Sequence, residues 1–287
     1  MLVTGEYLAP LLLEDVLHVI NDSICTVLAG GTDVYPSRVG KNLPDRIVDL
    51  SLVENLRGIT FQENFWRIGA TTTWADIVNT KLPSGFDCLK QAATQIGAVQ
   101  VQNSATIAGN LCTASPAGDS IPALLALDAE VELMSVKGSR RLKLEDFIIG
   151  YRKTALETNE IVTSINIPDV AANSTSSFEK FGTRAYLVIS LAMVATSIRR
   201  DVSGDISDLR ICVGACSPVA KRITKLEERL VGERKSKTAI DQIKVEDFSM
   251  LSPIDDIRCT AEYRFKLLPV LVKRALEHSG WWTNDDS

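Results

Sequence analysis

The chain has 287 residues, of which 45% are apolar and 23% charged, and its formal net charge is −5. This length and composition are typical of a soluble protein of one or two domains with a substantial core. Acidic and basic residues are mixed along the chain, which argues against nucleic acid as a partner, because phosphate neutralisation needs clustered Lys and Arg.

The apolar runs of the chain are too short or too interrupted to act as membrane anchors. Glu14 and Asp15 break the N-terminal run, which has no basic leader. The longest later run, residues 185–198, is shorter than the roughly 20 residues that cross a bilayer as a helix. We therefore expect a cytoplasmic chain without a signal peptide or a membrane span.

The first half of the chain mixes predicted helices and strands at short intervals. Apolar spacing predicts a helix at 11–22 behind Pro10, strands at 24–31, 46–51 and through Ile68, a helix that begins at Thr72 or Thr73, and a helix at 87–96 that Gly97 ends. Residues 99–120 show little helical periodicity, so we expect an irregular segment. A segment of this length inside a compact domain is usually functional.

The second half predicts strands first and helices afterwards. In chain order, the patterns give a short helix at 121–128, strands at 129–136 and 160–168, a small polar linker at 169–176, two paired strands at 186–200 and 208–217, and helices at 218–232, near 236–246 and at 261–278. The tail at 280–287 holds two adjacent tryptophans, which we expect to dock against the protein.

The cysteines and histidines do not form a recognisable catalytic or metal site. The six cysteines lack CxxC spacing, so they predict neither a zinc site nor an iron–sulfur site, and we expect buried thiols. The two histidines, His18 and His278, are expected on the surface or in packing roles. We therefore predict no catalytic side chain and no metal ligand, and a bound cofactor would have to carry any chemistry.

Two glycine-containing segments indicate a ligand. Paired glycines in "AGGTD" (29–33) allow a sharp turn and let backbone N–H groups approach a bulky anion such as a phosphate. A tight turn capped by Thr32 and Asp33 explains the same residues. The later motifs "TIAGN" (106–110) and "SPAGD" (115–119) add amides and polar side chains that suit a pyrophosphate and a polyhydroxyl chain.

The order and spacing of these motifs resemble the flavoprotein subunits of molybdenum hydroxylases, of the xanthine dehydrogenase and carbon monoxide dehydrogenase type. "EIVTSINIP", "FEKFGTR", "VGACSPVAKRITKLEERLVG" and "TAEYRFKLLPVLV" extend the resemblance over nearly the whole chain. The resemblance implies an α+β fold. A two-lobed FAD-binding domain of the vanillyl-alcohol-oxidase-like class would occupy 1–172, in subdomains of about 1–57 and 58–172. A smaller C-terminal domain with an antiparallel sheet and a helical bundle would occupy 176–287.

The resemblance also assigns cofactor-binding residues. Two loops would hold the FAD pyrophosphate through backbone amides, namely Val27, Leu28, Ala29, Gly30, Gly31, Thr32, Asp33 and Val34 in the first and Thr106, Ile107, Ala108, Gly109 and Asn110 in the second. Asp119 would bind a hydroxyl of the flavin chain, Ile96 would line the cleft, Val162 would pack near the ring and Lys180 would lie beside the flavin. Core packing for Ile96 and Val162, and a solvated cation for Lys180, are the alternatives.

Two positions depart from the family pattern. Ala108 replaces a glycine, which is tolerable only where φ is negative, and Gln102 stands where the family commonly has Arg. The cysteine-rich insertion of relatives with an additional iron–sulfur cluster is missing from this sequence.

By resemblance, the chain is the FAD subunit of a xanthine dehydrogenase-type oxidoreductase. It would receive electrons from a [2Fe–2S] small subunit, beside a molybdopterin-binding large subunit, and pass them to NAD or another acceptor. A flavin subunit of a carbon monoxide, nicotine or aldehyde dehydrogenase relative is one alternative. A flavin-free scaffold with the same fold and a simple phosphate-binding module are the others.

Overall fold

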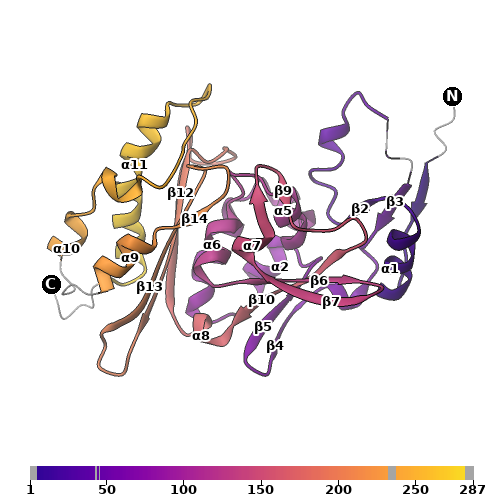
Figure 1. Ribbon diagram of the computed structural model, residues 1–287, viewed down its shortest axis with the longest axis horizontal. Helices are drawn as coiled ribbons and strands as arrows, with labels where there is room; N and C mark the ends of the chain where they lie inside the picture. The colour runs from indigo at the N-terminus through magenta and orange to yellow at the C-terminus, as the bar shows by residue number, and fades with distance from the viewer. Residues whose placement is uncertain (1–4, 43, 45, 232–236, 282–287) are drawn as a thin grey trace.

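The structure is a computed structural model that describes residues 5–42, 44, 46–231 and 237–281. Three of the four β-sheets in the described residues follow one another along the long axis of the molecule (Figure 1), with helices between and outside them, and the fourth is the small pair of β8 (Ile148–Gly150) and β9 (Lys153–Thr154). The structure thus has the predicted mixture of helices and sheets.

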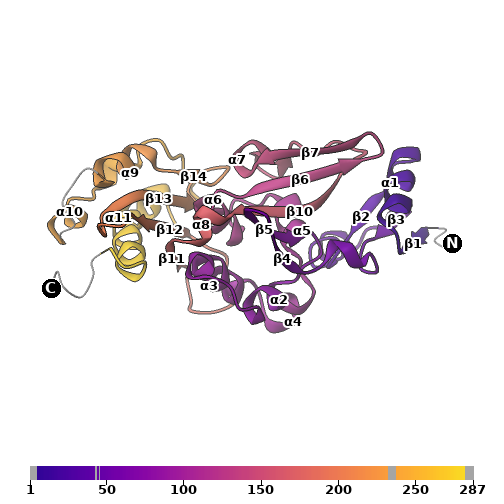
Figure 2. The same ribbon diagram turned by 90° about the horizontal axis from the view of Figure 1, so that it is seen from below.

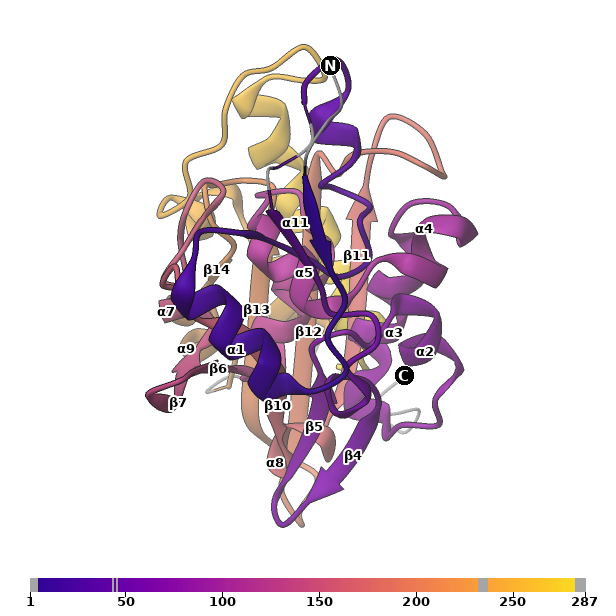
Figure 3. The ribbon, with the colours of Figure 1, turned by 90° about the vertical axis from the view of Figure 1, so that its right-hand side faces the viewer.

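The first sheet is a small parallel unit at the N-terminal end. Its strands lie in the order β1 (Glu6–Leu8), β3 (Arg46–Asp49), β2 (Thr26–Leu28). Helix α1 (Leu13–Asp22) buries Val16, Leu17 and Ile20 in one cluster with Val48 of β3. Helix α1, which is labelled in Figure 3, and strand β2 confirm the predicted order, in which a helix leads into a strand and the strand into the glycine loop.

The central sheet is antiparallel and five-stranded. Its order is β4 (Ile59–Gln62), β5 (Phe65–Gly69), β10 (Ile161–Pro168), β6 (Glu130–Ser135), β7 (Gly138–Lys143). Strands β5, β6 and β10 were predicted. The pattern gave no signal for β4 and β7; nearly all residues of both strands are exposed, so apolar alternation is absent.

Short helices cover this sheet, and two of them correct the sequence prediction. The helices are α2 (Trp74–Asn79), α3 (Asp87–Gln95), α4 (Val99–Ser104), α5 (Ile107–Thr113), α6 (Ser120–Ala126) and α7 (Leu144–Phe147). Thr73 caps α2 in a capping box with Asp76, as predicted. Residues 99–113 are not irregular, because α4 and α5 occupy most of them. Helices of six and seven residues are too short to show a 3.6-residue period.

The third sheet has the order β11 (Thr175–Phe181), β12 (Ala192–Arg200), β13 (Ile206–Gly214), β14 (Lys221–Arg222) and is antiparallel. Helices α9 (Thr224–Val231) and α11 (Ala261–His278) cover its outer face, and α3 and α6 contact it from the central region (Figure 2). Residues 192–198 of β12 are all buried, because helices cover both faces of this sheet.

The segment at 169–176 is not a linker. It forms α8 (Asp169–Ala172) and the start of β11, and Ala171, Ala172, Ser174 and Ser176 are buried. The turn at Ser84–Phe86 packs closely on this segment, since a Cβ on Gly85 would lie 2.5 Å from the carbonyl oxygens of Ala171 and Ala172.

The remaining elements are short or lie at the ends of the chain. They are β8 (Ile148–Gly150), β9 (Lys153–Thr154), α10 (Lys237–Asp241) and the 3₁₀ turns at Pro36–Arg38, Glu54–Leu56, Ser84–Phe86 and Val245–Phe248. Trp281 is fully buried, as predicted for the terminal tryptophans, whereas Trp282 and the rest of the tail lie outside the described residues. Within the described part of the chain, no helix has both the length and the apolar character of a bilayer span.

Candidate cofactor-binding site

The two glycine-containing segments meet at one pocket, which we call the loop pocket. Its volume is about 410 Å³, and it is lined by Val27, Gly30, Gly31, Thr32, Asp33, Val34, Ile96, Val101, Ala105, Thr106, Gly109, Asn110, Cys112 and Thr113. The first loop follows β2, and the other wall comes from α4, α5 and the residues between them. Ten of the predicted residues are therefore brought together here, namely Val27, Gly30–Val34, Ile96, Thr106, Gly109 and Asn110.

Glycines hold the first loop against the opposite wall. A Cβ on Gly30 would lie 1.9 Å from the carbonyl oxygen of Ser104, so only glycine allows this approach. Gly31 has φ +70°, a left-handed conformation that disfavours a side chain. The paired glycines thus serve the contact between the two walls as well as the turn.

The backbone donors of the first loop are uncommitted. Within the described residues, the N–H groups of Gly30, Gly31, Thr32, Asp33 and Val34 donate no hydrogen bond to the chain. Successive free amides in a turn form a concavity that suits an anion.

Three backbone N–H groups of the second segment already donate hydrogen bonds within the chain. They are therefore not free to bind the pyrophosphate in the way that the resemblance implied. The N–H of Ile107 donates to Thr72 O (3.0 Å), that of Ala108 to Ala70 O (3.2 Å) and that of Gly109 to Thr106 Oγ1 (3.1 Å). Ile107 and Ala108 are buried and do not line the pocket. The physical reason is that 107–113 is a helix, whose first N–H groups are satisfied by a neighbouring segment and by the Thr106 cap.

Asp119 and Lys180 form a buried ion pair beside this region. Lys180 Nζ donates to Asp119 Oδ2 at 2.6 Å, and both side chains are only 6% exposed, so Lys180 is not a solvated cation. The Ser190 hydroxyl donates to Asp119 Oδ1. Burial raises the pKa of the Asp119 carboxyl, and the opposing effects of Lys180 and Ser190 offset only part of this rise.

The other predicted residues have different surroundings. Val162 is buried in β10, paired with Leu133 of β6, and does not line the pocket. Leu28 is buried, and Ala29 lines a smaller neighbouring pocket together with Ser104 and Thr106. Ala108 lies inside α5 and is not among the residues with positive φ, so this substitution is tolerated. Gln102 Nε2 donates to Thr94 O at 3.0 Å.

The prediction of buried thiols is correct for only three of the six cysteines, and both histidines lie on the surface. Cys88, Cys212 and Cys216 are buried, but Cys25 and Cys259 are half-buried and Cys112 is exposed in the loop pocket. The side chain of His278 is exposed and hydrogen-bonds Glu179, and His18 is exposed. In the part of the chain that the structure describes, no three His, Cys, Asp or Glu side chains are grouped as metal ligands.

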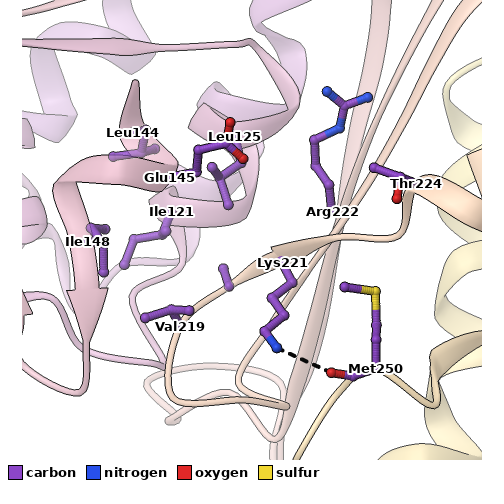
Figure 4. A pocket seen from close by; sticks show the side chains of 11 residues that line it. Ile121, Leu125, Leu144, Glu145, Ile148, Val219, Lys221, Arg222, Thr224 and Met250 are labelled. Carbon is purple, nitrogen blue, oxygen red and sulfur yellow. Dashed lines mark hydrogen bonds between the residues drawn. The ribbon is translucent and has the colours of Figure 1, made fainter. Parts of the chain in front are cut away.

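A second pocket, of about 450 Å³, lies between the central region and β14 (Figure 4). Apolar side chains such as Ile121, Leu125 and Leu144 line one side, and Lys221 donates to Met250 O on the other (Figure 4). None of the predicted cofactor residues lines it, so it is not the candidate site.

Comparison with known proteins identifies the family. A family model described as the FAD binding domain in molybdopterin dehydrogenase matches residues 3–170, and the CO dehydrogenase flavoprotein C-terminal domain matches residues 177–279. The chain belongs to this family of FAD-binding subunits of molybdenum hydroxylases. It is therefore part of an oxidoreductase, its cofactor is FAD, and the predicted fold class is confirmed.

Individual relatives agree with this membership. The chain is 36% identical over 235 residues to the nicotinate dehydrogenase FAD-subunit of Eubacterium barkeri, covering 79% of each chain. It is 29% identical over 272 residues to a putative xanthine dehydrogenase FAD-binding subunit of Escherichia coli, covering 93% of each. A solved structure of carbon monoxide dehydrogenase from Hydrogenophaga pseudoflava superposes with a TM-score of 0.86 at 28% identity, covering 96% of each chain.

The loop pocket fits the phosphate-bearing part of FAD by its own chemistry. It offers consecutive amides without partners, a left-handed glycine and the hydroxyl of Thr32. Sequence reasoning found the first loop but missed Arg152, Ser190 and the α4 side of the pocket. Only the placement of α4 opposite the loop could have revealed Val101 and Ala105.

Proposed function

We propose that FAD binds in the loop pocket with its diphosphate against the first loop. The observation that carries this proposal is the run of uncommitted N–H groups from Gly30 to Val34 on the pocket wall. Thr106 and Asn110 would contact the cofactor from the opposite wall. When bound, FAD supplies the electron-transfer chemistry, and the chain supplies binding and orientation.

The remaining predicted residues are proposed to act toward the flavin end of the cofactor. Asp119 would accept a hydrogen bond from a hydroxyl of the flavin chain, with Lys180 and Ser190 fixing its carboxylate. Ile96, at the pocket edge, would line the cleft, and Val162 would support the ring from the core. We also retain the domain division at 1–172 and 176–287, with the first domain split near residue 57.

We propose that the chain works in a complex with a molybdopterin-binding large subunit and a [2Fe–2S] small subunit. Several relatives are named as medium subunits or medium chains, for example the nicotine 6-hydroxylase medium subunit of Paenarthrobacter nicotinovorans. Electrons would enter FAD from the small subunit and leave to NAD or another acceptor. The six free cysteines favour a reducing compartment, so we propose a cytoplasmic location.

For the substrate of the complex we propose xanthine. The xanthine dehydrogenase FAD-binding subunits of Escherichia coli resemble the chain over 93% of its length. Nicotinate is the second candidate, because the nicotinate dehydrogenase subunit has a higher identity, 36%, although over a shorter part of the chain.

The test is co-expression of the chain with the molybdenum and iron–sulfur subunits encoded beside it. The three chains should co-purify, and xanthine should bleach the flavin absorbance only in the assembled complex. Bleaching by nicotinate and not by xanthine would assign the second substrate. Reduction of the flavin of the isolated chain by substrate would contradict the electron-relay role.

A further inference from the structure

The loop pocket has an unusual charge for a site that holds a diphosphate. Of the described residues that line it, only Asp33 carries a charged side chain at neutral pH, and that charge is negative. A carboxylate so close to two phosphate groups would repel them. The free amides carry only partial charges, and no cationic side chain among the described lining residues offsets Asp33.

Arg152 places a cation beside Asp33 from a distant part of the chain. Its Nη2 lies 3.1 Å from both carboxylate oxygens of Asp33, although 119 residues separate the two. Arg152 stands at the turn between β8 and β9 with φ +50°. Its backbone N–H donates to Ala114 O at 3.0 Å, just after α5. One residue thus joins the first loop to the end of the helix on the opposite wall.

We propose that Arg152 is a positioning residue for the cofactor diphosphate. Its guanidinium neutralises Asp33 and holds the first loop at a fixed distance from α5, so that the free amides bind the anion unopposed. This inference rests on the proposal that the diphosphate lies in the loop pocket. The pair is 44% and 55% exposed, and exposed ion pairs contribute little to folding, so we expect variants of Arg152 to keep the stability of the wild type.

The test is titration of FAD into the deflavinated full chain, followed by the quenching of flavin fluorescence. Arg152→Gln should weaken binding about tenfold, as expected for the loss of one nearby charge. Arg152→Lys, which keeps the charge, should bind nearly as tightly as the wild type. Asp33→Asn combined with Arg152→Gln should recover most of the loss, because the repelling carboxylate is then gone. Arg229→Gln is the matched control, since Arg229 forms a similar pair with Asp247 in the C-terminal region.

The possible outcomes test the role of Arg152 separately from the proposal that FAD binds in the loop pocket. Unchanged affinity in Arg152→Gln, with affinity lost in Gly31→Val, would overturn the role of Arg152 and leave the pocket standing. Unchanged affinity in both variants would overturn the pocket itself. No recovery in the double variant would show that Asp33 is not the group that Arg152 neutralises, and would overturn the inference.

Discussion

At Gly31 the first loop adopts a conformation that a side chain would strain. A Cβ would also lie 2.7 Å from the Tyr35 ring, so Gly31→Val must move that ring as well as strain a residue that lines the loop pocket. Strain of about 1–3 kcal/mol would lower the affinity for FAD roughly 5- to 150-fold. Flavin fluorescence titration measures this change.

The matched control for this variant is Gly40→Val. Gly40 has a similar φ of +75°, but nothing lies within 4 Å of the added Cβ, and it does not line the pocket. Its variant should bear similar backbone strain and bind FAD normally. Equal loss of flavin in both variants would mean that strain alone, and not the pocket wall, is responsible.

The buried pair of Asp119 and Lys180 allows a second residue-scale prediction. Lys180→Met leaves a buried carboxylate without its partner, which should lower the free energy of unfolding by about 3–5 kcal/mol. The added change Asp119→Asn should restore part of this loss, as measured by urea unfolding.

The same pair predicts a pH dependence. Because the pKa of Asp119 is raised, protonation removes the unpaired charge as the pH falls, so the deficit of Lys180→Met should shrink in acid. A deficit that grows in acid would contradict this account.

At the scale of elements, Asp256 anchors the segment that leads into α11. Burial raises its pKa, but N–H groups of Arg258 and Cys259 and the guanidinium groups of Arg258 and Arg264 outweigh this and lower it from 3.8 to about 2. Because the pKa of this carboxyl is lower in the folded chain than in the unfolded chain, the carboxylate stabilises the fold at pH values above the unfolded pKa. This stabilisation is lost as the pH falls from about 4 to about 2.

The variant Asp256→Asn tests this anchor. It should be less stable than the wild type at pH 6, and the difference should shrink toward pH 2. Fluorescence of the buried Trp281, which belongs to the same core cluster as α11, can follow unfolding. A difference that is the same at both pH values would rule out the carboxylate as its source.

The sequence predicted the elements that carry strong local signals. The capping threonine of α2, the helical pattern of α11 and the largely apolar run of β12 were visible in the amino-acid pattern. The helices α4 and α5 were missed because neither completes two turns. The exposed strands β4 and β7 were missed because their stability comes from pairing with β5 and β6 rather than from their own pattern.

The site could be predicted from the sequence where its residues are neighbours along the chain. The glycines of the first loop mark a turn whatever surrounds them, and they do line the loop pocket. Contacts across long sequence separations left no signal, as for Arg152 with Asp33 and Ser190 with Asp119. The resemblance supplied the second segment, but only the structure reveals that Ala70, Thr72 and the Thr106 cap already accept hydrogen bonds from most of its amides.

At the scale of the whole molecule, the largest hydrophobic core crosses the proposed domain boundary. One cluster contains Leu124 and Ala126 of α6 together with Phe178, Met193 and Cys212 of the third sheet. All residues of α6 are buried. A fragment of residues 1–174 would expose this helix and should be aggregated or bind a hydrophobic dye, whereas the full chain should not. A soluble, monomeric fragment that binds FAD would contradict this view of the core.

The buried position of α6 also limits how such chains can be recombined. Asp119 immediately precedes this helix. The helix that packs the central region against the third sheet therefore also positions a proposed cofactor-binding residue. A chimera that joins the N-terminal part of one relative to the C-terminal part of another at residue 175 would pair mismatched surfaces on α3 and α6. Functional exchange between relatives should therefore succeed with the entire subunit, or with a graft that includes the faces of both helices.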